Sequence, residues 1–182
     1  MKKESIAEGL THASDTRVIE VGRGILPRSG EILAQSLVQA ERPLLIVADE
    51  RTWTAAGKAV AESIAQAGLL QAEPLIFPGT PTLYAAYEHA EEVRERLRET
   101  DALGVAVGSG TLNDLVKLAS GELGQPYAVV GTAASMDGYS GFGAPMSQGG
   151  IKITMPCPAP AVVIFDLDVA AAAPKAMVAS GY

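Results

Sequence analysis

The 182-residue sequence contains only one cysteine, Cys157, and two histidines, His12 and His89. A single cysteine excludes an intramolecular disulfide and is typical of a reducing compartment, so we expect a cytoplasmic protein. Neither histidine has a second histidine, a cysteine or a carboxylate at metal-ligand spacing, so both are expected at the surface. No histidine–aspartate arrangement is visible to activate Cys157, which is therefore expected to be a packed thiol and not a nucleophile.

Aromatic residues make up only 5% of the chain and charged residues 19%, whereas 48% of the residues are hydrophobic. Such small aliphatic compositions are typical of α/β proteins, in which parallel strands are buried on both faces. The net charge of -7 argues against nucleic acid or an anionic membrane surface as a partner, because both need clustered Lys and Arg. No run reaches the ~18 apolar residues of a membrane span, and residues 1–10 do not form a signal peptide.

Apolar strand-like runs alternate with amphipathic helix-like runs along the chain. The predicted strands are 17–22, 44–49, 74–77, 104–107 and 127–130. The predicted helices are 31–40, 52–67 with Thr52 as its cap, 83–97 and 112–120. A hairpin-like pair, 151–155 and 162–168, is expected before a last helix that begins near Ala173. Alternation with short connections predicts an α/β fold, a Rossmann-like parallel sheet with helices on both faces.

The segment GSGTLND, from Gly108 to Asp114, follows a predicted strand and opens a predicted helix. Its glycines allow a ligand to approach the backbone closely, and the first amides of a helix can bind a phosphate. The usual dinucleotide fingerprint is absent, because Asn113 stands where its third glycine would be. The segment alone fits a phosphate-binding loop and a tight turn equally well.

Asp49 ends the strand 44–49. A carboxylate at this position can accept hydrogen bonds from the ribose hydroxyls of an adenosine and would repel a 2′-phosphate, which favours NAD over NADP. The alternative is that Asp49 only caps the following helix. With the glycine loop, it suggests a dinucleotide across the carboxyl ends of the strands.

A polar, glycine-rich stretch from residue 131 to residue 145 follows the strand 127–130 directly. A loop of this length inside a compact domain is more often functional than not. Thr132 and Ser135 are candidate donors to phosphate or ribose, and Asp137 is a candidate ligand for the hydroxyls of a small substrate. The alternative is a turn rich in helix caps.

Four segments resemble the glycerol dehydrogenase and dehydroquinate synthase superfamily, and more closely the bacterial branch of its sn-glycerol-1-phosphate dehydrogenases. They are GSGTLND (108–114), TAASMDGYSGFGAP (132–145), FDLDV (165–169) and APKAMVASGY (173–182). The resemblance extends over nearly the whole chain from about Arg17. Ala134 departs from it, because this subfamily frequently has proline there.

The resemblance implies a two-domain enzyme, of which this chain is the N-terminal, nucleotide-binding half. Residues 1–16 would be a tail, 17–172 the NAD(P)-binding α/β domain, and 173–182 the start of the connection to a helical metal-binding domain. No metal ligand is expected in this chain, since the aspartate and two histidines that hold Zn or Ni would lie beyond Tyr182. We therefore expect the chain alone to be inactive and, with an apolar face uncovered, to form a homo-oligomer.

The resemblance also implies the reaction, which is reduction of dihydroxyacetone phosphate, a small-molecule phosphate substrate, by NADH or NADPH. The residues that would contact the pyrophosphate are Gly108, Ser109, Gly110, Asn113 and Asp114. Asp49 would contact the adenosine ribose, Thr132 and Ser135 the nicotinamide side, and Asp137 the substrate. Three alternatives stay open: a glycerol dehydrogenase, a dehydroquinate-synthase-like enzyme, and a non-catalytic dinucleotide-binding module.

Overall fold

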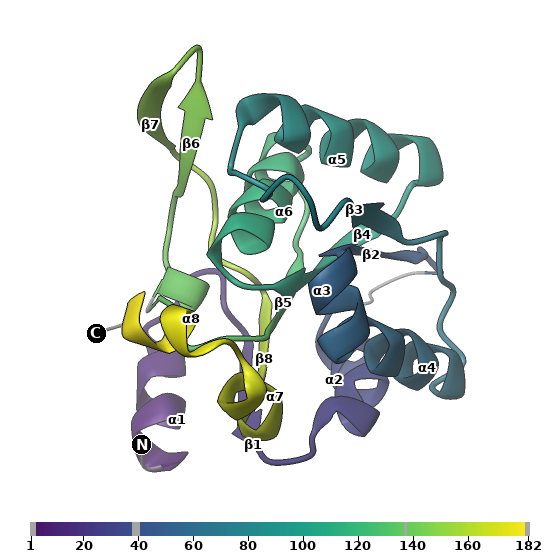
Figure 1. Ribbon diagram of the computed structural model, residues 1–182. Helices are drawn as coiled ribbons and strands as arrows, with labels where there is room; N and C mark the ends of the chain where they lie inside the picture. The colour runs from purple at the N-terminus through teal and green to yellow at the C-terminus, as the bar shows by residue number, and fades with distance from the viewer. Residues whose placement is uncertain (1–2, 38–40, 137, 181–182) are drawn as a thin grey trace.

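A sheet of six parallel strands, in the order β1-β8-β5-β4-β2-β3, forms the centre of the molecule (Figure 1). The computed structural model describes residues 3–37, 41–136 and 138–180. The strands are β1 Val18–Gly22, β2 Leu44–Asp49, β3 Leu75–Phe77, β4 Leu103–Gly108, β5 Ala128–Gly131 and β8 Val162–Asp166. The predicted fold class, a Rossmann-like parallel sheet between helices, is confirmed.

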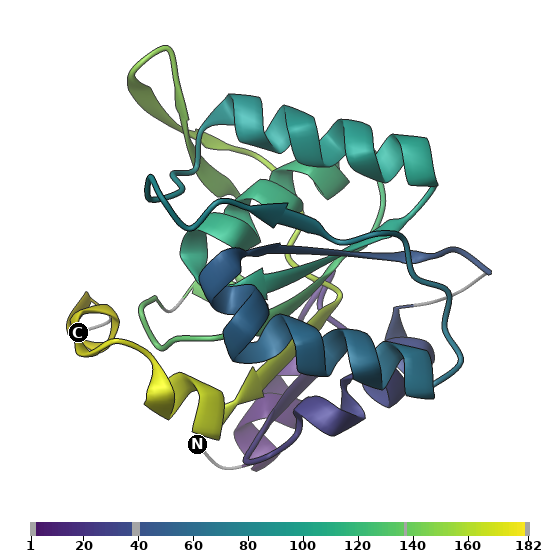
Figure 2. The same cartoon turned by 45° about the vertical axis from the view of Figure 1, so that its right-hand side comes forward.

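Helices cover both faces of this sheet, with α2 and α4 on one side and α5 and α6 on the other (Figure 2). The helices are α1 Lys3–Thr11, α2 Ser29–Ser36, α3 Glu50–Thr52, α4 Lys58–Gln66, α5 Tyr87–Thr100, α6 Gly110–Glu122, α7 Leu167–Ala172 and α8 Lys175–Ser180. A π-helical stretch, Trp53–Gly57, joins α3 to α4, and 3-10 turns lie at Leu26–Arg28 and Gly138–Ser140.

The burial of strand β2 on both faces explains why its sequence is a continuous apolar run. Leu45 and Val47 pack into the core beneath α5 and α6, whereas Leu44, Ile46 and Ala48 pack into the core beneath α2 and α4. All five are at most 1% exposed. Successive side chains of a strand point to opposite faces, so a strand covered on both sides has no polar alternation.

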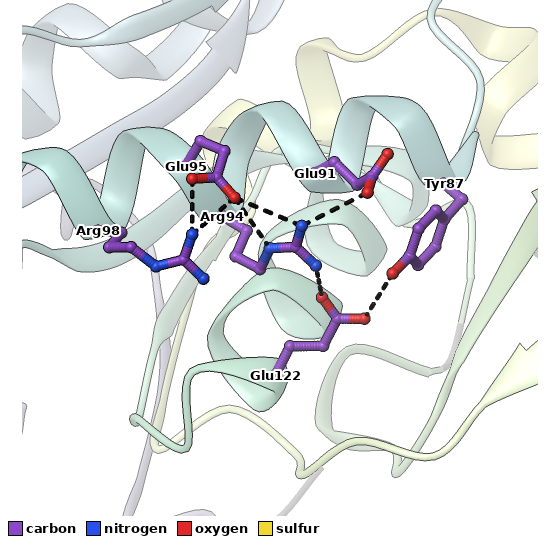
Figure 3. A network of polar contacts seen from close by, with 6 residues as sticks. All are labelled: Tyr87, Glu91, Arg94, Glu95, Arg98 and Glu122. Atoms are coloured by element: carbon purple, nitrogen blue, oxygen red, sulfur yellow. Dashed lines mark hydrogen bonds and ion pairs between the residues drawn. The ribbon is translucent and has the colours of Figure 1, made fainter.

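Ion pairs and hydrogen bonds hold α5 against the end of α6 (Figure 3). Arg94 Nη1 lies 2.5 Å from Glu122 Oε2, and Tyr87 donates its hydroxyl to Glu122 Oε1 at 3.1 Å. Hydrogen bonding to Glu122, opposed by partial burial, raises the pKa of the Arg94 guanidinium. The outer charges, such as the pair Arg98–Glu95, are solvated, as expected for an exposed face of an amphipathic helix.

The predicted hairpin between 151–155 and 162–168 is wrong. Strand β7 Ile151–Met155 pairs antiparallel with β6 Ala144–Gln148, and this two-stranded ribbon projects beyond the sheet in Figures 1 and 2. Strand β8 instead lies inside the parallel sheet, between β1 and β5, and ends at Asp166 where α7 begins. Burial explains the difference: β8 is covered on both faces, and four of the five β7 residues are exposed.

Three smaller predictions also differ from the structure. Residues 3–11 form α1 where a tail was expected, with Ile6 and Leu10 half-buried one helical turn apart. The helix after β2 begins at Glu50 and is capped by Asp49, not by Thr52. The predicted helix 31–40 ends at Ser36, and residues 38–40 lie outside the described residues. Among the residues described, no helix is long and apolar enough to cross a bilayer.

Candidate functional site

The sheet has a topological switch point between β2 and β4. These strands are paired neighbours, with Val47 beside Ala106, but the helices that follow them cover opposite faces of the sheet. The two connections therefore diverge at the carboxyl ends, where open α/β sheets bind their ligands. Asp49 and Gly108 are the last residues of the two strands.

A cavity of about 440 Å³ opens at this switch point. Its lining comes from five parts of the chain: the end of β2 with the helix that follows, the segment after β3, the start of α6, the start of the glycine-rich loop, and α7 with α8. The lining residues are Asp49, Arg51, Thr52, Ala55, Pro78, Gly79, Thr82, Leu83, Ser109, Thr111, Leu112, Thr132, Val169, Ala172, Ala173, Pro174 and Met177. Of the predicted site residues, the cavity brings Asp49, Ser109 and Thr132 together.

Asp49 is fixed by a reciprocal capping box. Its Oδ1 accepts a hydrogen bond from Thr52 N at 2.7 Å, and its own amide donates to Thr52 Oγ1 at 3.0 Å. The capping alternative is thus observed, yet the half-buried carboxylate also lines the cavity. Capping one oxygen of a carboxylate leaves the other able to accept hydrogen bonds from a ligand.

The start of α6 has no such cap. Ser109 is the N-cap residue, in extended conformation, and its side chain makes no capping hydrogen bond. The first amides of a helix have no partner inside the helix, and here they lie where Ser109, Thr111 and Leu112 line the cavity. A methyl group on Gly110 would lie 3.1 Å from Met136 Sδ, so a side chain here would also crowd the loop opposite. The geometry suits an anion at this end of the helix.

The glycine-rich loop, residues 131–145, is hydrogen-bonded to the carboxyl end of β4. Thr132 N donates to Gly108 O at 3.0 Å, and Tyr139 donates its buried hydroxyl to Ala133 O at 2.7 Å. Thr132 is 5% exposed and lines the cavity, whereas the half-buried Ser135 is outside the lining. Asp137, the predicted substrate ligand, lies outside the described residues.

Asn113 and Asp114 lie within α6, away from the cavity lining. Asn113 is fully buried and its Oδ1 accepts a hydrogen bond from Tyr127 Oη at 3.0 Å. Asp114 is 8% exposed, and its burial raises the pKa of its carboxyl to about 6, although Lys117 Nζ at 3.8 Å acts in the opposite direction. This packing therefore does not favour direct contact of either side chain with a pyrophosphate at the start of α6.

Lys117 connects α6 to the end of the glycine-rich loop. Its Nζ donates to Gly141 O at 2.9 Å and to Gly143 O at 3.1 Å, and the residue is 2% exposed. Burial lowers the pKa of this ammonium group, while the charge of Asp114 partly opposes that effect. These contacts fit a structural role for Lys117 and not contact with a phosphate.

In the part of the chain that the structure describes, the remaining reactive side chains form no catalytic cluster. Among residues 3–37, 41–136 and 138–180, no group of three His, Cys, Asp or Glu could hold a metal ion. His89 packs edge-on against Phe77 and lies 3.9 Å from Glu92. Cys157 is buried, and its burial raises the pKa of its thiol, which makes the thiolate less available. The described residues therefore do not fit a catalytic metal.

Several lining residues were not predicted from the sequence. Arg51 could have been found, because a side chain two positions after a strand-end Asp is at the same edge of the sheet. The segment after β3, which supplies Gly79, Thr82 and Leu83, carries no signal beyond its prolines and glycine. Met177 comes from α8, and only the folded chain brings this helix to the cavity.

Comparison with known proteins gives consistent matches. A family model described as iron-containing alcohol dehydrogenase matches residues 20–174. A protein of Halalkalibacterium halodurans named glycerol-1-phosphate dehydrogenase (NAD(P)+) is 37% identical over 139 residues, 75% of this chain and 35% of that protein. The chain thus spans about a third of the length of this curated relative.

Solved structures share the fold. Glycerol dehydrogenase from Schizosaccharomyces pombe matches with a TM-score of 0.76 at 20% identity, covering 93% of this chain and 42% of its own. A 2-deoxy-scyllo-inosose synthase complexed with carbaglucose-6-phosphate, NAD+ and Co2+ matches with a TM-score of 0.71 at 18% identity. The match covers 90% of this chain and 45% of the synthase chain. The resemblance drawn from the four sequence segments is confirmed.

Proposed function

Because this chain belongs to the iron-containing alcohol dehydrogenase family, we propose that it binds NAD or NADP in the cavity between β2 and β4. The observation that carries the proposal is one cavity lined both by a strand-end carboxylate, Asp49, and by the uncapped start of α6 at Ser109. A dinucleotide has ribose hydroxyls that can bond the Asp49 carboxylate and a pyrophosphate that can bind at the start of α6.

The proposed pose follows from these two ends. The pyrophosphate lies on the backbone of Gly108, Ser109 and Gly110, and Gly110 has no side chain to block it. The adenosine ribose donates a hydrogen bond to the carboxylate oxygen of Asp49 that does not cap the helix. Thr132, fastened to Gly108, then borders the nicotinamide half. Ser135 and Asp137 belong to the same loop and are proposed contacts of the nicotinamide side and the substrate. Asn113 and Asp114 are buried within α6 and are not proposed as direct ligands.

For the whole enzyme we propose reduction of dihydroxyacetone phosphate to glycerol 1-phosphate, on the strength of the relatives' name. The bound nicotinamide would supply the hydride. Residues 17–172 would be its nucleotide-binding domain, and 173–182 the start of a connection to residues that hold the metal. This chain's own residues bind and orient the cofactor.

Isothermal titration of the 182-residue chain with NAD+ and with ADP-ribose tests the binding proposal. We expect both to bind, because ADP-ribose retains the ribose and pyrophosphate that contact Asp49 and the start of α6. The Gly110→Val variant should lose both ligands and keep its circular dichroism spectrum. Equal affinities in the folded variant and the original chain would contradict the proposed pose.

The turnover prediction concerns the same chain. We expect no NADH oxidation with dihydroxyacetone phosphate, even with added Zn²⁺ or Ni²⁺, because the described residues hold no three-ligand cluster. A longer chain that includes the following residues of the reading frame is the comparison. Turnover by the short chain at the rate of the long one would show that the active site is misassigned. Turnover by neither, with metal bound in the long chain, would favour glycerol or a cyclitol precursor as substrate.

A further inference from the structure

Arg51 carries a charge at the cavity that the proposed NAD pose does not use. It lies in the first turn of the helix after β2, two residues beyond Asp49, and its exposed side chain lines the cavity. In the described part of the chain no carboxylate oxygen comes within 4 Å of its guanidinium, whereas Arg94 and Arg98 on α5 both have such partners. An unpaired guanidinium beside a cavity is available to a ligand.

The neighbouring carboxylates are occupied by backbone amides. Glu50 Oε2 accepts a hydrogen bond from Gly79 N at 3.0 Å, and Asp49 Oδ1 accepts one from Thr52 N at 2.7 Å. Arg51 reaches the same rim of the cavity, since its Nε would lie 3.7 Å from a methyl group on Gly79. Each carboxylate thus accepts a hydrogen bond from a backbone amide, which reduces the negative potential that it contributes to the cavity.

A guanidinium near the strand-end carboxylate has a specific chemical consequence. The ribose of NAD offers a 2′-hydroxyl to Asp49, and the ribose of NADP offers a phosphate of about two negative charges at the same atom. Asp49 alone would disfavour that phosphate. Arginine binds phosphate through paired N–H donors in a planar fork, which lysine cannot reproduce.

We propose that Arg51 binds the 2′-phosphate of NADP and so makes the site accept both dinucleotides. This inference rests on the proposed binding of a dinucleotide between β2 and β4, and it names the residue that sets cofactor choice there. Arg51 contributes to NADP binding and little to NAD binding, because NAD has no group at the position that its guanidinium reaches.

The test is titration of the 182-residue chain with NADP+ and NAD+, for the original sequence, Arg51→Gln and Arg51→Lys. Arg98→Gln is the matched control, because it removes one exposed positive charge from α5, outside the cavity lining. We expect Arg51→Gln to weaken NADP+ about tenfold, the effect of one charge-assisted contact at an exposed site, and NAD+ less than about twofold. Arg51→Lys should restore part of the loss, and Arg98→Gln should change neither.

Each other outcome contradicts a different claim. If NAD+ binds but the ratio of the two affinities is the same in Arg51→Gln as in the original chain, Arg51 does not contact the 2′-phosphate. If NAD+ binds and NADP+ does not, the site is not dual and the inference is wrong while the proposed function stands. If the folded chain binds neither, both fail.

Discussion

Two strand–helix junctions of the same design lie side by side at the switch point, and they differ in how the helix begins. At the end of β2 a carboxylate, Asp49, caps the helix that follows, with Thr52 completing the box. At the end of β4 the cap residue is Ser109, whose side chain caps nothing, and α6 begins open to the cavity. Because a cap and a bound phosphate compete for the same amides, the open start is the one that can bind an anion.

A third junction at this edge strengthens the contrast. At the end of β8, buried Asp166 accepts hydrogen bonds from the amides of Asp168, Gly24, Ile25 and Leu26. Burial works to raise the pKa of this carboxyl, but the amide bonds outweigh it and lower the pKa. Aspartates at two of the three helix starts serve structure, and the helix without one, α6, starts after Gly108 and Ser109.

The largest effect is expected from Asp166→Ala. The change leaves the buried amides of Ile25 and Leu26 without their acceptor, and we expect it to lower the free energy of unfolding by about 3 kcal/mol. Urea denaturation measures it, with Asp168→Ala, an exposed partner of Arg23, as a nearly neutral control. Since the pKa of Asp166 is lowered in the fold, its contribution is present at neutral pH and is lost as the pH falls below about 4. A difference between variant and original that stays constant as the pH falls below about 4 would contradict the assignment.

The second-largest effect distinguishes the roles of Gly108 and Gly110, the two glycines between β4 and the first turn of α6. Gly110→Val should weaken NAD+ binding at least about a hundredfold, the loss expected from two charge-assisted hydrogen bonds, with little change in stability. Gly108→Ala should instead destabilise the fold, because its methyl group would lie 2.9 Å from Leu112 Cβ. Calorimetric titration and urea denaturation of both variants decide. A Gly110→Val protein that is unfolded would mean that the first turn of α6 is packed more tightly than these contacts indicate.

The sequence predicted the parallel sheet well because its strands are apolar on both faces. It failed at β6 and β7, whose ribbon projects from the body. Four of the five β7 residues are exposed, so this strand has no buried face that would specify its partner, and β6 buries only Ala144 and Met146. The run 162–166 was assigned to a hairpin, although its unbroken apolar pattern is that of an interior parallel strand. The N-terminal α1 was missed because only Ile6 and Leu10 mark its buried side.

The site was predictable where it depends on strand ends. Asp49, Ser109 and Thr132 each follow or end a parallel strand, and parallel strands bring their carboxyl ends to one edge. Asn113 and Asp114 share the motif but lie about one turn into α6, where 100° of rotation per residue carries their side chains into the interior. Met177 and Leu83 depend on tertiary packing, which no local pattern encodes.

The third effect compares two buried carboxylates with opposite shifts. Asp166 is surrounded by amides, whereas Asp114 lies among Lys117, Tyr127 and Cys157 with a raised pKa of about 6. Between about pH 4 and 6 the folded chain keeps the proton on Asp114 that the unfolded chain has released. Stability should therefore fall by about 3 kcal/mol as the pH rises through this window, and level off above it. Urea midpoints of Asp114→Asn, measured against the original chain, should lack this decline; the same slope in both would show that Asp114 is not its source.

The smallest effect tests the central contrast by making the open junction resemble the closed one. Ser109→Asp should cap α6 and raise the free energy of unfolding by about 0.5 kcal/mol, because Asp is a strong cap and complements the helix dipole. The same carboxylate would occupy the amides and repel the pyrophosphate, so NAD+ affinity should fall about tenfold. Ser109→Asn is the matched variant, since it caps without charge and should show a smaller gain in stability with a smaller loss of affinity. Stability and affinity that rise together in Ser109→Asp would mean that the ligand does not bind at the start of α6, and that the missing cap has another cause.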